Sequence, residues 1–177
     1  MNRLTGKNIY LIGFMATGKS RVGRELARLL KWPFVDTDQW VEKSAGLRIS
    51  EIFSFQGEDV FRDLESAVIQ QIVGRRHQVI SLGGGAVLRE ENWQAIATSG
   101  ITVCLTATLQ TIIQRVQRKN DRPLLNNESN ESLQEKINQM LDQRWPHYQR
   151  ADYFFESREQ VSAHELALKI YHRLLEA

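Results

Sequence analysis

The stretch that decides the fold runs from residue 13 to residue 20 and reads Gly13-Phe14-Met15-Ala16-Thr17-Gly18-Lys19-Ser20. An apolar, β-branched run at 8–12 precedes it, and apolar residues at helical spacing follow it over 21–31. In the order strand, loop, helix, the pattern G-x-x-x-x-G-K-S predicts a phosphate-binding loop, whose backbone N–H groups and helix dipole favour an anion. We expect Lys19 to reach the β- and γ-phosphates of a nucleoside triphosphate and the Ser20 hydroxyl to ligate Mg²⁺.

The composition is that of an ordinary globular protein. The chain has 177 residues, of which 42% are hydrophobic and 25% charged, enough for one α/β domain with a core. The 23 basic and 21 acidic residues are dispersed, so the net charge of +2 suits an anionic small molecule, and no nucleic-acid partner is expected. The single cysteine, Cys104, lies in an apolar run that predicts a buried strand residue rather than a nucleophile. No signal segment or bilayer-spanning apolar run is evident, so a cytoplasmic location without a membrane partner is expected.

Short strand patterns alternate with helical patterns along the chain. The predicted strands are 8–12, 33–38, 78–82, 101–105 and 153–155. The predicted helices are 21–31, 39–44, 51–55 with Ser50 as N-cap, 58–73, 90–98, a helix capped by Thr108 that ends near 118, 133–144 and 163–175. The polar, aperiodic segment 119–130 is predicted to be a mobile loop. The alternation predicts an α/β fold with a five-stranded parallel sheet covered by helices on both faces, and ligands bind beyond the carboxyl ends of such strands.

Two further groups of residues follow predicted strands. Asp36 and Asp38 occupy alternate positions of an extended end, so their carboxylates are expected to point the same way. One can hold Mg²⁺ through water while the other orients or deprotonates an acceptor hydroxyl; the alternative is a pair of helix N-caps. The run Gly83-Gly84-Gly85 lets the backbone approach a ligand closely, although one glycine would suffice for a turn. Because both groups and the phosphate-binding loop follow strand ends, the sequence predicts one active site.

Three arginines have an ordinary interpretation when each is taken alone. Arg62 can form a surface ion pair with Glu58 or Glu65, Arg144 can end a surface helix, and Arg122 can solubilise its loop. Phosphoryl transfer needs cations at the moment of transfer, often from a segment that closes over the phosphates, and Arg122 in the polar loop suits that role.

The motifs together closely resemble those of the shikimate kinase family, over nearly the whole chain. They are the phosphate-binding loop, Phe34-Val35-Asp36-Thr37-Asp38, Gly57-Glu58-Asp59-Val60-Phe61-Arg62-Asp63-Leu64-Glu65, Leu82-Gly83-Gly84-Gly85, Arg122-Pro123-Leu124-Leu125 and Gln143-Arg144-Trp145-Pro146-His147-Tyr148. The phosphate-binding loop is common to many proteins, whereas this combination is specific. The resemblance implies a single P-loop kinase domain over 1–177, with a mobile lid at about 119–130 and a shikimate-binding helical region at about 37–65.

The resemblance also implies the reaction, transfer of the γ-phosphate of ATP to the 3-hydroxyl of shikimate. The implied catalytic residues are Lys19, Asp38 and Arg122, and the implied metal ligands are Ser20 and, through water, Asp36. The implied substrate-binding residues are Asp38, Arg62, Gly83, Gly84, Gly85 and Arg144. The implied nucleotide-binding residues are Gly13, Ala16, Thr17, Gly18, Lys19, Ser20, Arg21, Arg115, Arg122 and Gln160. The expected cofactors are ATP and Mg²⁺, and the chain is expected to act as a monomer.

Ala16 departs from the family pattern, which usually has glycine at that position. If the loop needs a positive φ there, a Cβ costs about 1 kcal/mol, which the general motif tolerates but which can loosen nucleotide binding. Two alternatives stay open from the sequence. One is another small P-loop kinase, for gluconate or a nucleoside, against which Arg62, Arg144 and Asp38 argue together. The other is a binding protein that kept the fold and lost turnover, against which the presence of Lys19, Asp38, Arg62 and Arg122 argues.

Overall fold

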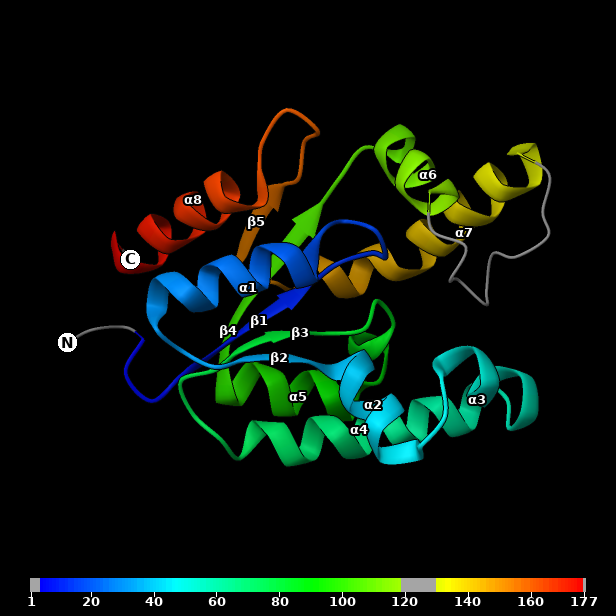
Figure 1. Cartoon of the computed structure of the whole chain (residues 1–177), viewed down its shortest axis with the longest axis horizontal. Coiled ribbons are helices and arrows are strands. Elements are labelled where there is room, and N and C mark those ends of the chain that lie inside the picture. Colours follow the sequence, from blue (N-terminus) through cyan, green and yellow to red (C-terminus); the bar gives the residue numbers. More distant parts are fainter. Residues whose placement is uncertain (1–3, 119–129, 177) are drawn as a thin grey trace.

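A computed structural model describes residues 4–118 and 130–176, which form a five-stranded parallel sheet flanked by helices (Figure 1). The strands are β1 (Asn8–Ile12), β2 (Phe34–Asp36), β3 (Val79–Ser81), β4 (Gly100–Thr106) and β5 (Tyr153–Glu156). Their spatial order is β2-β3-β1-β4-β5, and every neighbouring pair is parallel. The predicted α/β class and the five-stranded parallel sheet are therefore confirmed.

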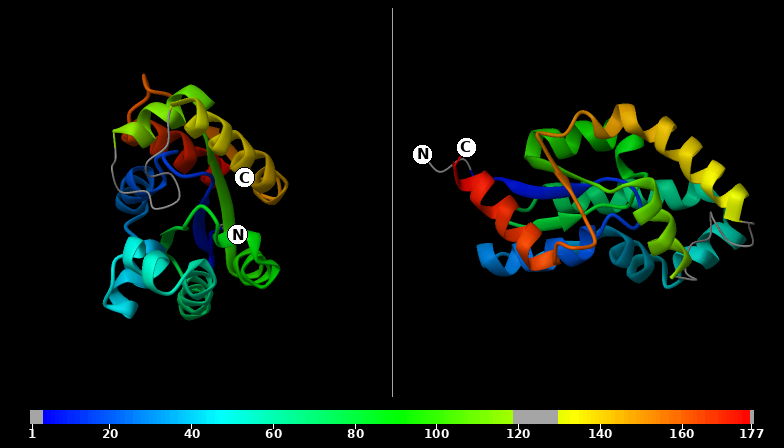
Figure 2. Two further views of the ribbon diagram at one scale, coloured as in Figure 1. Left: turned by 90° about the vertical axis from the view of Figure 1, so that its right-hand side faces the viewer. Right: turned by 90° about the horizontal axis from the view of Figure 1, so that it is seen from above.

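Helices cover both faces of this sheet (Figure 2). They are α1 (Lys19–Leu30), α2 (Thr37–Ala45), α3 (Ile49–Phe55), α4 (Glu58–Val73), α5 (Glu90–Ser99), α6 (Leu109–Gln117), α7 (Asn130–Tyr148) and α8 (Ala163–Glu176), with a 3₁₀ turn η1 (Ala86–Leu88). Alternate residues of β1 point to opposite faces, so Ile9 and Leu11 pack with α1 and α8. Tyr10 and Ile12 belong to the second core, with α4 to α7. This arrangement confirms the prediction of two covered faces.

The prediction was wrong about the end of the second strand. β2 ends at Asp36, and Thr37 and Asp38 form the first turn of α2. The Asp36 side chain accepts a hydrogen bond from the Asp38 N–H at 3.2 Å, so Asp36 is the N-cap of α2. The alternative interpretation as a cap is thus correct for Asp36. The two carboxylates are placed by a strand-to-helix turn, and not by a common strand face.

Other element boundaries also differ from the predicted ones, mostly by one or two residues. The cap of α3 is Arg48 rather than Ser50, because the Glu51 side chain accepts from the Arg48 N–H at 2.7 Å and closes the first turn. The turn η1 was not predicted. α7 extends on both sides of the predicted range 133–144 and includes Pro146.

The structure also bears on the predictions for Cys104, for the segment 119–130 and for membrane-spanning helices. Cys104 is buried in β4, as predicted, and burial raises the pKa of its thiol to about 12. The predicted lid 119–130, including Arg122, lies outside the described residues except for the first residue of α7. Within residues 4–118 and 130–176, no helix is long and apolar enough to cross a membrane.

Candidate active site

The loop between β1 and α1 has the backbone shape that its glycines predict. Gly13 has a φ of 127° and Gly18 a φ of 95°, both in the left-handed region. A Cβ on Gly13 would collide with the carbonyl oxygen of Leu105 in β4, so only glycine fits there. The buried Thr17 hydroxyl donates to the Phe14 carbonyl at 2.8 Å, which braces the loop from within. The Thr17 side chain therefore contributes to the shape of the loop.

Lys19 is the first residue of α1, and its side chain curls back over the loop. Its side-chain Nζ donates to the carbonyl oxygens of Gly13 at 2.8 Å and Phe14 at 2.9 Å. The residue is only 9% exposed, so its positive charge lies inside the concavity of the loop. A phosphate bound there would meet both this ammonium group and the amino-terminal end of the α1 dipole.

Ser20 in α1 and Asp36 at the end of β2 lie within hydrogen-bond distance of each other. The Ser20 hydroxyl donates to Asp36 Oδ2 at 2.6 Å, and the Ser81 hydroxyl lies 3.3 Å from it. Hydroxyl and carboxylate oxygens are hard ligands of the kind that Mg²⁺ prefers. In the part of the chain that the structure describes, no three acidic, histidine or cysteine side chains form a metal cluster.

Ala16 has a φ of 61°, so the loop does hold a side-chain-bearing residue in the left-handed region. Ala16→Gly is expected to raise the free energy of unfolding by about 0.5–1 kcal/mol, because glycine relieves the strain but makes the unfolded chain more flexible. Urea denaturation measures this change.

A matched control for Ala16→Gly is Lys31→Gly, since Lys31 has a φ of 57° at the other end of α1. Both variants are expected to gain stability, and only Ala16→Gly is expected to lower the KM for ATP. A KM for ATP that falls equally in both variants would contradict this assignment of local strain.

A cavity of about 340 Å³ opens beside the phosphate-binding loop. Its lining includes all of the predicted metal- and substrate-binding residues, together with other side chains of α2, α3 and α4: Met15, Ser20, Asp36, Asp38, Gln39, Glu42, Ile49, Ser50, Phe53, Phe61, Arg62, Glu65, Gly83, Gly84, Gly85 and Arg144. A larger depression of about 830 Å³ between β5 and α8 is lined by none of the predicted site residues. The predicted metal- and substrate-binding residues therefore lie at the smaller of these two cavities.

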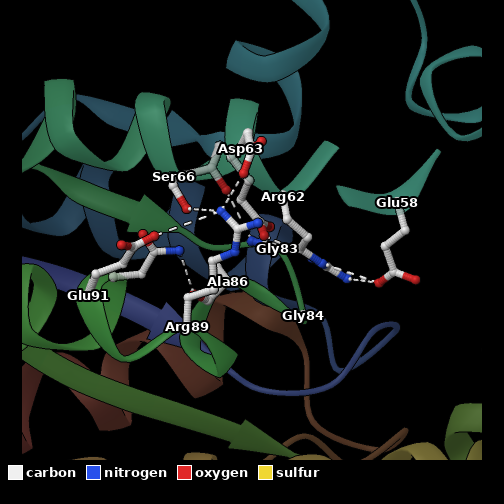
Figure 3. Close-up of polar contacts among 12 residues, drawn as sticks. Glu58, Arg62, Asp63, Ser66, Gly83, Gly84, Ala86, Arg89 and Glu91 are labelled. Carbon is white, nitrogen blue, oxygen red and sulfur yellow. Dashed lines mark hydrogen bonds and ion pairs between the residues drawn. The ribbon is translucent and has the colours of Figure 1, made fainter. Parts of the chain in front are cut away.

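Arg62 points into this cavity from α4 and is held by two carboxylates. Its guanidinium donates to Glu65 at 2.8 Å and to Glu58 at 2.9 Å, and Figure 3 shows the contact with Glu58. The Arg62 side chain is 11% exposed and Glu65 1% exposed, whereas Glu58 is half exposed. Arg62 thus forms ion pairs with both Glu58 and Glu65, as the interpretation as a surface arginine suggested, but the pair with Glu65 is buried. Burial raises the pKa of the Glu65 carboxyl, and the charge of Asp38 raises it further, against the opposing effect of Arg62.

The three glycines after β3 fit around these side chains. A Cβ on Gly83 would collide with the carboxylates of Glu65 and Asp38, and one on Gly85 would collide with the Arg62 guanidinium. The Gly83 N–H donates to the buried Thr37 hydroxyl at 3.0 Å, which joins this loop to the start of α2. The run is more than a turn, because side chains of the cavity occupy the space that any larger residue would need.

Arg144 is 7% exposed and lies over the Phe14 ring, with 5.6 Å from its guanidinium carbon to the ring centre. The interpretation as a surface helix end is therefore wrong.

Sequence analysis missed Glu65 as a buried cavity residue and Tyr148 as a neighbour of the site. A signal was available for Tyr148, since it stands four residues after Arg144 and so shares a helix face with it.

Arg115, one of the residues implied to bind the nucleotide, connects three segments of the fold. Its guanidinium donates to the Ala16 carbonyl at 3.1 Å and to the buried Ser157 hydroxyl at 3.0 Å, joining α6, the phosphate-binding loop and the segment after β5. Arg21 in α1 and Gln160 in the turn after β5 have exposed side chains. Arg122 lies outside the described residues.

The fold and the site define a class of protein before any comparison. A phosphate-binding loop at the carboxyl end of a parallel sheet opens directly into a cavity that holds two arginines and several carboxylates. This is the architecture of a P-loop phosphotransferase with a small, polar and anionic acceptor.

Comparison with known proteins agrees with this class. Residues 15–175 match the family model described as shikimate kinase. The chain is 44% identical over 171 residues to the shikimate kinase of Thermodesulfovibrio yellowstonii, covering 95% of this chain and 96% of the relative. It is 41% identical over 144 residues to that of Thermus thermophilus, covering 81% and 77%. The chain belongs to the shikimate kinase family, whose members are ATP-dependent kinases of a small-molecule alcohol.

Solved structures give the same result. Shikimate kinase from Acinetobacter baumannii in complex with shikimate superposes with a TM-score of 0.92 at 36% identity, covering 98% of this chain and 95% of that one. Shikimate kinase from Aquifex aeolicus gives a TM-score of 0.80 at 35% identity, covering 96% of both chains. A gluconokinase from Sinorhizobium meliloti, at 18% identity and a TM-score of 0.61 over 98% of this chain and 96% of that one, shares the fold alone. The comparisons therefore favour the predicted family over the gluconate kinase alternative.

Proposed function

We propose that this chain binds ATP and shikimate side by side and transfers the γ-phosphate to the 3-hydroxyl, giving 3-phosphoshikimate and ADP. The observation that carries the proposal is the continuity of one cavity from Ser20 and Asp36 to Asp38, Arg62 and Arg144. Family membership supports the same reaction.

The acceptor end of the cavity suits a small hydroxylated acid. Arg62 and Arg144 are two largely buried guanidinium groups, and a planar guanidinium binds a carboxylate through two parallel hydrogen bonds. Glu58 is the more exposed of the two Arg62 partners, so a substrate carboxylate can exchange with it while Glu65 keeps the guanidinium oriented. The glycines 83–85 leave room for a ring beside these groups.

Asp38 is proposed as the group that receives the hydroxyl. It lies at the start of α2, close enough to Gly83 that an added Cβ there would be 2.8 Å from its Oδ1. A carboxylate at that place can accept a hydrogen bond from the attacking hydroxyl and take its proton as the new O–P bond forms.

The donor end is proposed to use Lys19 for the β- and γ-phosphates and Arg115 beside the nucleotide. Ser20 and Asp36 would hold Mg²⁺, which supplies charge neutralisation at the phosphates when bound. Chelation by excess EDTA is expected to abolish turnover, and added Mg²⁺ to restore it. Arg122 is proposed to complete the site from the segment 119–130.

A coupled ADP-release assay with Mg-ATP, with and without shikimate, tests the function. Shikimate-dependent ADP release is expected. Gluconate and nucleoside monophosphates serve as competing acceptors, and a preference for either of them would overturn the choice of acceptor. ATP binding without turnover on any acceptor would instead favour the kinase-like binding protein.

The protein is further proposed to act as a monomer in the cytoplasm, without a nucleic-acid or membrane partner. The dispersed charge of the sequence, 23 basic and 21 acidic residues, supports the absence of a nucleic-acid partner. Light scattering at assay concentrations tests the monomer.

A further inference from the structure

Tyr148 ends α7 and has no role in the mechanism proposed above. Its side chain is 2% exposed and packs in the core that α4 to α7 form against the sheet. Its hydroxyl donates to the carbonyl oxygen of Gly84 at 2.5 Å, across 64 positions of sequence. The residue is not part of the cavity lining, so it touches the site from behind.

The carbonyl that Tyr148 binds belongs to Gly84, the residue of the glycine run that lies next to both Arg144 and the phosphate-binding loop. A Cβ on Gly84 would lie 3.4 Å from Arg144 Nη1, 3.4 Å from the Met15 backbone nitrogen and 3.6 Å from the Gly13 carbonyl oxygen. Gly84 is therefore the place where the glycine run 83–85, the phosphate-binding loop and Arg144 meet.

The hydrogen bond also orients a peptide group. A trans peptide plane keeps its C=O and N–H antiparallel, so fixing the Gly84 carbonyl toward Tyr148 turns the Gly85 N–H to the opposite side of the loop. Both glycines line the cavity, and the space that a Cβ on Gly85 would take is filled by the Arg62 guanidinium. Tyr148 thereby sets the backbone against which Arg62 packs.

Tyr148 interacts with Arg144 as well, one helical turn earlier on α7. Burial raises the pKa of the Tyr148 hydroxyl, while the charge of Arg144 and a hydrogen bond from it act in the opposite direction. The tyrosine thus contacts both a backbone and a side-chain element of the acceptor end.

We propose that Tyr148 is a positioning residue for shikimate, holding the Gly84–Gly85 peptide and Arg144 in one binding-competent geometry. This inference rests on the proposed function. It predicts that a change at Tyr148 alters the KM for shikimate and not the KM for ATP, because Tyr148 reaches the cavity through Gly84 and Arg144, which line its acceptor end.

The test is Tyr148→Phe, which removes the hydroxyl and keeps the ring in its place in the core. The KM for shikimate is expected to rise about 3- to 10-fold, the effect of one buried hydrogen bond, with the KM for ATP changed less than about 2-fold. Tyr10→Phe is the matched control. Tyr10 is also fully buried, and its hydroxyl lies 2.6 Å from the Ser99 hydroxyl, in a polar contact that includes no cavity residue. Both variants are expected to lose stability, and only Tyr148→Phe is expected to lose affinity for shikimate.

The outcomes separate this inference from the function on which it rests. Wild-type protein without shikimate-dependent turnover would reject the proposed function. Wild-type turnover with an unchanged KM for shikimate in Tyr148→Phe, or with equal increases for ATP and shikimate, would reject only the positioning role. If Tyr148→Phe is too unstable for kinetics, the rise in melting temperature on adding shikimate gives the same comparison at lower starting stability. A shift as large as in wild type would overturn the inference.

Discussion

Replacing Asp38 by asparagine is expected to lower kcat for shikimate phosphorylation about 10²- to 10⁴-fold, the usual contribution of a positioned general base. Asparagine has nearly the same shape but cannot accept the proton that the hydroxyl loses. The KM for ATP should change little, because the phosphate-binding loop and Lys19 are untouched. Steady-state kinetics with each substrate varied in turn measures both effects.

The control for Asp38→Asn is Asp59→Asn. Asp59 is an exposed carboxylate in the first turn of α4 and does not line the cavity. Each change removes one negative charge near a helix N-terminus, which costs about 0.3–1 kcal/mol of stability in either helix. Only Asp38→Asn should lose turnover. A kcat within about 10-fold of wild type in Asp38→Asn would be below the range of a general base and would reject that role for Asp38.

Arg62→Ala is expected to raise the KM for shikimate at least about 30-fold, the lower end of the ~2–5 kcal/mol lost when one partner of a buried charge pair is truncated. The KM for ATP should stay close to that of wild type, since Arg62 contacts the acceptor end alone. The truncation also leaves Glu65 buried without its cation, so the free energy of unfolding is expected to fall by about 3–5 kcal/mol. Kinetics and urea denaturation of the same preparation separate the two losses.

Two further variants serve as controls for Arg62→Ala. Arg62→Lys preserves a cation for Glu65 but not the planar fork, so it should recover stability better than it recovers shikimate binding. Arg89→Ala is the matched arginine control. Arg89 binds Asp63 at 2.8 Å and Ser66 at 3.2 Å beside the same helix but does not line the cavity (Figure 3). Equal losses of ATP and shikimate affinity in Arg62→Ala, or a similar KM change in Arg89→Ala, would contradict the assigned contact.

Much of the fold was predictable because its signals are local. The glycines at 13 and 18 allow the left-handed backbone of the loop, and the alternation of strands with helices specifies a covered parallel sheet. The end of the second strand was not predictable in the same way. An Asp-Thr-Asp run is compatible with both an extended end and a capped helix, and the cap formed by Asp36 decides between them.

The roles of the charged residues depend on what lies opposite each of them. Arg62 and Glu65 are three residues apart and have the pattern of an ordinary surface pair, and only packing against the glycine run buries them. Arg144 has the sequence context of an exposed helix end, yet the Phe14 ring covers it. Burial is a property of the partner surface, which sequence periodicity does not contain.

The sequence by itself determined that this chain folds around a phosphate-binding loop and belongs with kinases of a small acid, because contiguous motifs carry both conclusions. The tertiary structure alone decided how the acceptor end is built: Asp38 in a helical turn, Glu65 buried beside it, and Tyr148 bound to Gly84 across 64 positions. The physical reason is the range of the interactions. A loop or a helix turn forms between near neighbours, whereas these contacts arise only after separate elements pack on the sheet and exclude water.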